Sequence, residues 1–271
     1  MEYFCFELKT LVSVEQMWDR LSEDGFQLLY ANEDPNGQKQ IYGYLPSKFC
    51  SSQLKVEYPE IKDFYLVQFN SINWHDQWGA LNETFIDIDL KKYSTQKALK
   101  FKMRPGPGFG DLSHPTTQLA LRLMAPQISG KFVIDLGCGS GVLSFAAAKL
   151  GAQSVCGIDI DENALMHARD NLEHNAELKG QVHFQSPKEP LQVPKNVPVL
   201  LVMNMIYQEQ ETAWKSLPQL HTLPMICITT GILREKKQQK LYEAMCKDWG
   251  WAQLECLHEG KWCGYVSQFS P

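Results

Sequence analysis

The stretch Val133-Ile134-Asp135-Leu136-Gly137-Cys138-Gly139-Ser140-Gly141 decides the fold of this chain. Its apolar beginning predicts a buried strand, and the apolar residues after the last glycine predict a helix. Glycines at every second position let a ligand approach bare backbone near a helix N-terminus, where nucleotide-like ligands bind. The third glycine comes one residue earlier than in the Gly-x-Gly-x-x-Gly pattern of dinucleotide-binding proteins. The stretch therefore disfavours a nicotinamide cofactor.

An acidic residue follows where a nucleoside cofactor needs one. Asp159 ends the next predicted strand, in Val155-Cys156-Gly157-Ile158-Asp159, and comes 22 residues after Gly137 (159 − 137 = 22). A carboxylate at such a strand end can accept hydrogen bonds from both ribose hydroxyls. The glycine cluster and the acid together predict a nucleoside-cofactor site.

Residues 117–271 alternate between predicted helices and predicted strands. Repeated β-α units predict an α/β fold in which a doubly wound, mostly parallel, seven-stranded sheet carries helices on both faces. Two strands in succession at the end predict an antiparallel closing hairpin. The expected helices cover 117–124, 141–150, 162–175, 209–216 and 235–249, and the expected strands cover 132–136, 154–158, 182–185, 197–203, 225–230, 252–257 and 264–269.

The beginning of the chain predicts a separate, smaller α/β domain. Short strands are expected over 3–8, 26–31 and 64–69, with a helix over 13–22. Two more strands, over 85–90 and 98–103, precede Pro105-Gly106-Pro107-Gly108, which is either a hinge or a fixed turn. We therefore expect a small α/β domain over 1–70, a linker with connecting strands over 71–104, and a cofactor-binding domain over 105–271.

Composition excludes several classes of protein. The chain has 271 residues, of which 44% are hydrophobic and 21% charged, as in ordinary globular proteins. It has no apolar run of the roughly 18 residues that span a membrane, and its start lacks the pattern of a signal peptide. We expect a cytoplasmic protein with no membrane partner. The eight cysteines never approach Cys-x-x-Cys spacing, which predicts buried reduced thiols and no metal site.

The negative charge is unevenly distributed. Residues 1–100 carry ten Lys and Arg against fifteen Asp and Glu, whereas residues 101–271 carry sixteen of each. Nucleic-acid binding depends on neutralising phosphates, so an acidic beginning argues against a nucleic-acid partner and suits a basic protein substrate. The alternative is that the charge only keeps a small domain soluble. A monomer is expected.

Two motifs give the chain a family resemblance. Asp-x-Gly-x-Gly-x-Gly at 135–141 and Gly-Ile-Asp-Ile-Asp at 157–161 resemble the class I S-adenosylmethionine-dependent methyltransferases. Over residues 74–269 the chain is further similar to the ribosomal protein L11 methyltransferase family. The segments that carry this similarity are Gly108-Phe109-Gly110-Asp111-Leu112-Ser113-His114-Pro115-Thr116-Thr117, Lys149-Leu150-Gly151-Ala152, Asn204-Met205-Ile206, Thr230-Gly231-Ile232-Leu233 and Glu259-Gly260-Lys261-Trp262, with a linker at Trp74-His75-Asp76-Gln77-Trp78.

The resemblance implies S-adenosyl-L-methionine as the cofactor, and Thr117, Gly137, Gly139, Asp159 and Asn204 as its binding residues. Several of these stand at or just past strand ends, where doubly wound sheets bind ligands. Read without the resemblance, Thr117 is an early-turn residue of a helix and Asn204 a turn former.

The resemblance also implies an activity, the methylation of lysine and N-terminal amines of ribosomal protein L11, which the small front domain recognises. A lysine of pKa about 10.4 costs about 4.6 kcal/mol to deprotonate at pH 7, so the protein must align a neutral amine. The side-chain oxygen of Asn204 is the candidate for orienting that amine, whereas the catalytic base stays unknown. His114, a lone loop histidine, is interpreted as positional.

The chain departs from the family pattern at two positions, and it has two further acidic residues near the predicted site. Asp111 and Leu112 stand where the family has Thr and Gly, and Asp111 either attracts a substrate ammonium or faces solvent. Asp135 is expected to be a structural acid satisfied by backbone amides, and Asp161 a helix cap.

Two alternative functions stay open, namely an RNA or small-molecule methyltransferase of the same fold, and a non-catalytic S-adenosylmethionine-binding protein. Asn204-Met205-Ile206-Tyr207 lacks the Asn-Pro-Pro-aromatic motif used on planar nitrogens, which disfavours the first. The intact glycines and Asp159 disfavour the second.

Overall fold

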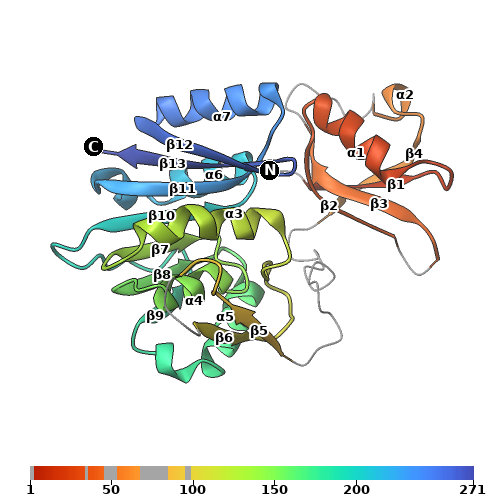
Figure 1. Ribbon diagram of the computed structural model, residues 1–271. Helices are drawn as coiled ribbons and strands as arrows, with labels where there is room; N and C mark the ends of the chain where they lie inside the picture. The colour runs from red at the N-terminus through yellow and green to blue at the C-terminus, as the bar shows by residue number, and fades with distance from the viewer. Residues whose placement is uncertain (1–2, 34–35, 46–53, 68–84, 95–98) are drawn as a thin grey trace. The chain divides into compact units, whose positions relative to one another are not determined.

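The computed structural model describes residues 3–33, 36–45, 54–67, 85–94 and 99–271 (Figure 1). Two compact units make up the chain, Met1–Ile72 and Asn73–Pro271. The segment from Trp74 to Trp78, expected to be a linker, lies outside the described residues.

The N-terminal unit is an antiparallel sheet that packs against a helix. Its strands β1 (Tyr3–Leu8), β2 (Gln27–Glu33), β3 (Lys39–Tyr44) and β4 (Ile61–Val67) lie in the order β2-β3-β1-β4. Helix α1 (Val14–Glu23) begins at Ser13, whose hydroxyl accepts the Gln16 N–H, and α2 (Leu54–Glu57) is a single turn. Strand β3 was not predicted, because Gly43 and polar residues interrupt its apolar pattern.

The second unit is built on a seven-stranded sheet of order β12-β13-β11-β10-β7-β8-β9. The strands β11, β10, β7, β8 and β9 are parallel, and β13 runs antiparallel to β11 and β12. The predicted mostly parallel sheet and its antiparallel closing hairpin are confirmed. The bounds are β7 (Phe132–Leu136), β8 (Ser154–Ile158), β9 (Val182–Gln185), β10 (Val199–Asn204), β11 (Met225–Leu233), β12 (Trp251–Glu259) and β13 (Trp262–Phe269).

Helices cover both faces of this sheet, as the doubly wound prediction requires. Side chains of α3, α4 and α5 share one hydrophobic core, and side chains of α6 and α7 share the other. Strand β7 is buried on both faces because Val133 points into the first core while Phe132 and Ile134 point into the second. The helices are α3 (Pro115–Met124), α4 (Val142–Lys149), α5 (Glu162–Glu173), α6 (Tyr207–Ser216) and α7 (Lys236–Asp248), with 3₁₀ turns η4 (Ala125–Gln127), η5 (Ala176–Leu178) and η6 (Pro218–Thr222).

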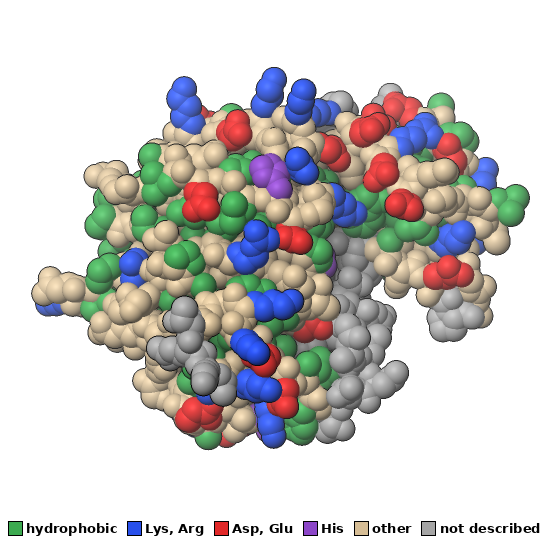
Figure 2. All heavy atoms as spheres, in the orientation of Figure 1, with side chains coloured by type: hydrophobic (Ala, Val, Ile, Leu, Met, Phe, Trp, Pro, Cys, Tyr) green, Lys and Arg blue, Asp and Glu red, His purple; other side chains and the backbone are tan. Residues whose placement is uncertain are grey.

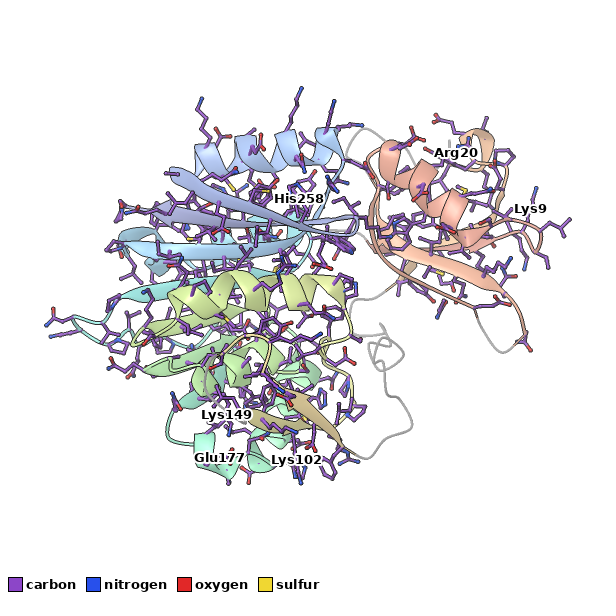
Figure 3. The ribbon with its side chains drawn as sticks, in the orientation of Figure 1. Lys9, Arg20, Lys102, Lys149, Glu177 and His258 are labelled. Carbon is purple, nitrogen blue, oxygen red and sulfur yellow. The ribbon has the colours of Figure 1, made fainter. Side chains whose placement is uncertain are left out.

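A two-stranded hairpin packs on the side of the sheet that α4 and α5 cover. It pairs β5 (Ile86–Asp89) with β6 (Lys100–Met103), and Ile88, Phe101 and Met103 enter the first core. Nearby, Lys149 at the end of α4 lies 2.7 Å from the carboxylate of Glu177 (Figure 3). The chain leaves the hairpin through residues 104–110, which we call the strap.

Candidate cofactor site

The carboxyl ends of three neighbouring parallel strands meet at the predicted site residues. Gly137 follows β7, Asp159 follows β8 and Asn204 ends β10. The chain passes from β7 to β8 on one side of β7, whereas β10 lies on the other side of β7. This reversal of strand order is the point at which doubly wound sheets bind ligands. The fold therefore brings these three predicted residues to one edge of the sheet.

The glycine loop can be built only from glycine. Gly137, Gly139 and Gly141 have φ values of +77°, +53° and +84°, the left-handed region that side chains disfavour. Gly137 is partly exposed and a Cβ there would lie 2.1 Å from Cε of Met205. Gly139 is buried and a Cβ there would lie 2.5 Å from the carbonyl oxygen of Phe109. Of the two predicted contact residues, Gly137 is thus the one with an accessible backbone face.

Asp159 is tied to the glycine loop through backbone amides. Its Oδ2 accepts the Gly139 N–H at 2.9 Å and its Oδ1 accepts the Asp161 N–H at 3.0 Å. Burial raises the pKa of the Asp159 carboxyl, although the bonds from Asp161 and Gly139 lower it. Asp161 is the N-cap of α5 and accepts the Asn163 N–H at 3.0 Å, which confirms its interpretation as a helix cap.

Asn204 and Thr117 are joined in the structure, although they stand 87 residues apart. The Nδ2 of Asn204 donates to the Thr117 hydroxyl at 3.4 Å, and the hydroxyl of Thr230 donates to Oδ1 of Asn204 at 2.8 Å. Thr117 and Thr230 are fully buried, while Asn204 is partly exposed. Sequence reasoning missed Thr230 as a partner of Asn204. The two residues are register partners on neighbouring strands, which their spacing along the chain does not indicate.

The strap lies directly on the glycine loop. The Ser140 N–H donates to the Phe109 carbonyl at 2.9 Å, and the Ser140 hydroxyl donates to the Gly110 carbonyl at 2.5 Å. A Cβ at Gly108 would lie 2.6 Å from the Ser140 nitrogen, so the two backbones are in contact. Asp111, just after the strap, is only 5% exposed and accepts the Ser113 N–H and hydroxyl. The expectation that Asp111 faces solvent was wrong, because it closes a local turn.

His114 has a structural place at the start of α3. Its Nδ1 lies 3.3 Å from the Thr116 nitrogen, whose N–H it accepts, and 2.7 Å from the Thr116 hydroxyl. Its ring makes an edge contact with Phe109 and a tilted contact with Trp262. Burial lowers its pKa to about 4, so the imidazole is neutral at pH 7. With Nδ1 accepting from Thr116, the proton is assigned to Nε2. This arrangement supports the positional interpretation of His114.

Asp135 is a structural acid whose main partner is a hydroxyl. It is buried on β7, and the Ser144 hydroxyl donates to its Oδ2 at 2.6 Å. Burial raises its pKa to about 7, against the bonds from Ser144. Asp135 accepts a backbone amide of Ser144, as predicted, and also the Ser144 hydroxyl, because α4 brings Ser144 over the strand.

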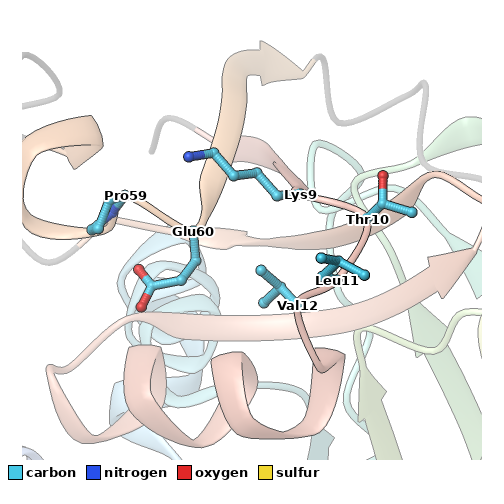
Figure 4. Close-up of a pocket in the computed structure, with 6 residues that line it drawn as sticks. All are labelled: Lys9, Thr10, Leu11, Val12, Pro59 and Glu60. Carbon is cyan, nitrogen blue, oxygen red and sulfur yellow. The ribbon is translucent and has the colours of Figure 1, made fainter.

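Two surface features are formed by other residues. An open recess of about 650 Å³ in the N-terminal unit is lined by Lys9, Thr10, Leu11, Val12, Pro59 and Glu60 (Figure 4). Lys and Arg side chains gather over α7 (Figure 2), which carries the exposed residues Lys236, Lys237, Lys240 and Lys247. Neither feature contains a predicted site residue.

Other expectations concern metals, thiols and membranes. Within the described ranges, no group of His, Cys, Asp and Glu side chains is arranged to hold a metal ion. The seven described cysteines are unpaired and six of them are buried, while Cys50 lies outside the described residues. Of the helices that the structure describes, none has the length and apolarity needed to cross a membrane.

The residues at the strand ends fit S-adenosylmethionine. Gly137 is partly exposed and has no side chain, so its backbone is open to a ligand. The two oxygens of Asp159 accept backbone N–H groups and have about four lone pairs between them, so they can also accept hydrogen bonds from ribose hydroxyls. Thr117 and Asn204 add polar groups at the neighbouring strand ends.

Comparisons with known proteins place the chain in a family. The family model for ribosomal protein L11 methyltransferase (PrmA) matches residues 47–270. A ribosomal protein L11 methyltransferase of Shigella sonnei is 43% identical over 170 residues, which cover 61% of this chain and 56% of that protein. One of Ruminiclostridium cellulolyticum is 34% identical over 166 residues, covering 61% of this chain and 52% of that protein. The chain thus spans about half the length of the curated relatives it matches.

A solved structure, the ribosomal protein L11 methylase of Lactobacillus delbrueckii, is 28% identical, covers 61% of this chain and 82% of its own, and has a TM-score of 0.49. The sheet order and the glycine loop of the present chain are those of a class I S-adenosylmethionine-dependent methyltransferase. Within that class, the chain belongs to the ribosomal protein L11 methyltransferase (PrmA) family.

Proposed function

We propose that this chain transfers methyl groups from S-adenosylmethionine to lysine or N-terminal amines of ribosomal protein L11 or a related basic protein. The observation that carries the proposal is the meeting of Gly137, Asp159 and Asn204 at the carboxyl ends of three adjacent strands. Family membership supports the choice of substrate. The free described cysteines fit a reaction in the cytoplasm.

In this proposal each of the cofactor-binding residues would contact a different part of the cofactor. Asp159 would accept the ribose hydroxyls, the partly exposed backbone of Gly137 would lie against the cofactor, and Thr117 and Asn204 would bound the site on the β10 side. Gly139 would act mainly by donating its N–H to Asp159. The cofactor, when bound, supplies an activated methyl group on sulfur.

The chain itself must present a neutral amine in line with that methyl group. Asn204 is the candidate for this role, because Thr230 and Thr117 hold its amide in one orientation with Oδ1 as the acceptor. An amide oxygen has two lone pairs, so Oδ1 can accept from Thr230 and from a substrate amine at once. The proton of a substrate ammonium leaves to water beforehand at a cost of about 4.6 kcal/mol at pH 7, which partial desolvation lowers.

The proposal divides the chain by role. Residues 1–70 would recognise the substrate, residues 71–104 would connect, and residues 105–271 would hold the cofactor. The acidic excess of the first hundred residues, fifteen acidic against ten basic, suits a basic partner.

The test is the intact mass of purified ribosomal protein L11 after incubation with this chain and S-adenosylmethionine. We expect mass increases in steps of one methyl group, and fragmentation then locates the modified amines. The Asn204→Ala variant should lose most of its turnover, and calorimetry measures its cofactor affinity separately; unchanged affinity and unchanged turnover would contradict the role of Asn204. Cofactor binding without any mass increase would contradict L11 as the substrate and direct the assay to other basic proteins and then to RNA.

A further inference from the structure

Three buried polar side chains form a row along α5 and the turn that follows it. His167, Asn171 and Asn175 are 6%, 0% and 2% exposed and are spaced four residues apart, so they share one face of the helix. Buried polar groups are costly unless they are hydrogen-bonded. Each of the three has at least one partner on the backbone between Lys102 and Gly108.

The two asparagines bind this backbone as a neighbouring β-strand would. Asn175 accepts the Lys102 N–H at 2.9 Å and donates to the Lys102 carbonyl at 2.7 Å. Asn171 accepts the Arg104 N–H at 2.8 Å and donates to the Ser140 carbonyl, in the glycine loop, at 3.3 Å. Lys102, labelled in Figure 3, lies on β6, and Arg104 begins the strap.

His167 joins the two ends of the strap. Its Nε2 lies 2.7 Å from the Arg104 carbonyl, and its Nδ1 accepts the Gly108 N–H at 3.0 Å. Because a carbonyl only accepts and an amide N–H only donates, the proton is assigned to Nε2 and Nδ1 is the acceptor. Asn171 Nδ2 lies 3.2 Å from the same Nε2 and directs its own bond to Ser140.

Two glycines of the strap, Gly106 and Gly108, leave no room for a side chain, one against His167 and the other against the glycine loop. A Cβ at Gly106 would lie 2.5 Å from Nε2 of His167, so the backbone rests on the imidazole ring. A Cβ at Gly108 would lie 2.6 Å from the nitrogen of Ser140 and 2.7 Å from the carbonyl carbon of Gly139. The Pro-Gly stretch is therefore a fixed turn between α5 and the glycine loop.

We propose that His167 is a positioning residue for cofactor binding, acting through the strap on the glycine loop. Helix α5 begins three residues after Asp159, so one element sets both the predicted ribose acid and the anchor of the strap. The strap in turn supplies the Phe109 carbonyl that accepts the Ser140 N–H, and covers Gly139, whose N–H donates to Asp159. This inference rests on the proposed binding of S-adenosylmethionine.

Three replacements of His167 separate its two hydrogen bonds. His167→Leu removes both. His167→Asn keeps an oxygen near the position of Nδ1 for the Gly108 N–H, and His167→Gln keeps an N–H near the position of Nε2 for the Arg104 carbonyl. His183→Leu, on the exposed side of β9, is the matched control. Thermal unfolding of each variant shows that it folds.

Two readouts test the inference in the full chain. Calorimetry with S-adenosylmethionine should give a dissociation constant at least tenfold higher for His167→Leu, intermediate values for His167→Asn and His167→Gln, and an unchanged value for His183→Leu. Hydrogen exchange without cofactor should become faster at residues 104–110 in His167→Leu and stay unchanged in the control. The second readout needs no cofactor, so it tests the anchoring of the strap even in a chain that binds none.

The outcomes separate this inference from the proposed function. If the parent chain binds S-adenosylmethionine and every His167 variant binds it within twofold of the parent, the positioning role is overturned. Unchanged exchange at the strap in His167→Leu overturns it as well. If the parent chain binds no S-adenosylmethionine, the proposed function fails, and the role of His167 in cofactor binding fails with it, whereas faster exchange would still establish the anchor.

A paired substitution tests the steric contact directly. Gly106→Ala should weaken cofactor binding severalfold, because its methyl group meets the imidazole ring of His167. In a His167→Ala background the same substitution should cost much less, because the ring is gone. Equal costs in the two backgrounds would contradict the contact on which the inference depends.

Discussion

The side-chain amide of Asn204 makes hydrogen bonds to two buried threonine hydroxyls. Its Oδ1 accepts from Thr230, and its Nδ2 donates to Thr117. If Asn204 orients the substrate amine, the bond from Thr230 fixes the direction in which the free lone pair of Oδ1 points. A buried hydroxyl can thus matter for turnover without touching a ligand.

We predict that Thr230→Val lowers kcat about tenfold, which corresponds to about 1.4 kcal/mol, the size of one hydrogen bond. The dissociation constant for S-adenosylmethionine should stay within about twofold, and Thr230→Ser should restore kcat. The neighbouring Thr229, whose hydroxyl bonds to Tyr242 instead, provides the control, since Thr229→Val should reduce stability without the loss in kcat. Steady-state kinetics with L11 and calorimetry give the two quantities.

A second prediction at this scale concerns His114, whose pKa of about 4 in the folded chain lies below the 6.5 of an exposed histidine. Between these values the unfolded chain binds the proton and the folded chain does not, so the contribution of His114 to stability falls as the pH falls. At about pH 5 the loss amounts to about 2 kcal/mol, and above about pH 7 there is none.

The comparison that isolates this effect is His114→Asn, because asparagine is a good N-cap and can still accept the Thr116 N–H. Denaturant unfolding at several pH values should show the parent chain losing stability relative to the variant from pH 7 to pH 5. A constant difference between the two chains would mean that His114 is not shielded from water as described. All other titrating groups, Asp135 included, are common to both chains and cancel.

Among the elements, strand β11 carries an irregularity that serves the site. Its pairing with β13 shifts register between Thr230 and Ile232, and Gly231 at this bulge has φ +89°. A Cβ at Gly231 would lie 2.5 Å from the Met205 carbonyl oxygen, and Gln210 donates to the carbonyls of Met205 and Thr230 at 2.6 Å and 3.0 Å. Gly231 therefore lets β11 pass close to the loop after β10, directly beyond the ladder position at which Thr230 pairs with Asn204.

We predict that Gly231→Ala destabilises the chain by about 3 kcal/mol or more and lowers methyl transfer, because it adds a steric clash to the strain of a left-handed residue. Gly130 has a similar φ of +70° but nothing within 4 Å of a Cβ, so Gly130→Ala isolates the strain at about 1 to 2 kcal/mol. Chemical denaturation of the two variants measures both values. Equal losses would argue against the close contact with Met205.

For the molecule as a whole, the division into the units Met1–Ile72 and Asn73–Pro271 suggests a division of labour. We predict that residues 73–271 expressed alone bind S-adenosylmethionine within about threefold of the full chain, since all predicted cofactor residues and both large cores lie in that unit. Methyl transfer to L11 should fall by at least about a hundredfold, which is about 2.7 kcal/mol of lost substrate recognition. Retained transfer would place recognition of the substrate in the second unit.

Much of this architecture is readable from local patterns. The order of strands and helices from 117 to 271, the glycine loop and the cap at Asp161 all follow from residues within one or two turns of each other. Strand β3 was not predicted because its alternation of apolar and polar residues is weak. The burial of Asp111 was not predicted because a single acidic residue in a loop belongs to no periodic pattern.

What the amino-acid sequence determined by itself was the fold class, the family and the residues at the strand ends, because spacing along the chain dictates which groups a β-α unit carries to its carboxyl end. Only the tertiary structure decided which groups hold those residues in place. Thr230 reaches Asn204 across 26 residues and His167 reaches Gly108 across 59, and such pairs leave no signature in sequence spacing. Their hydrogen bonds depend on how helices and loops far apart in the chain pack onto one sheet, which burial of the two cores sets.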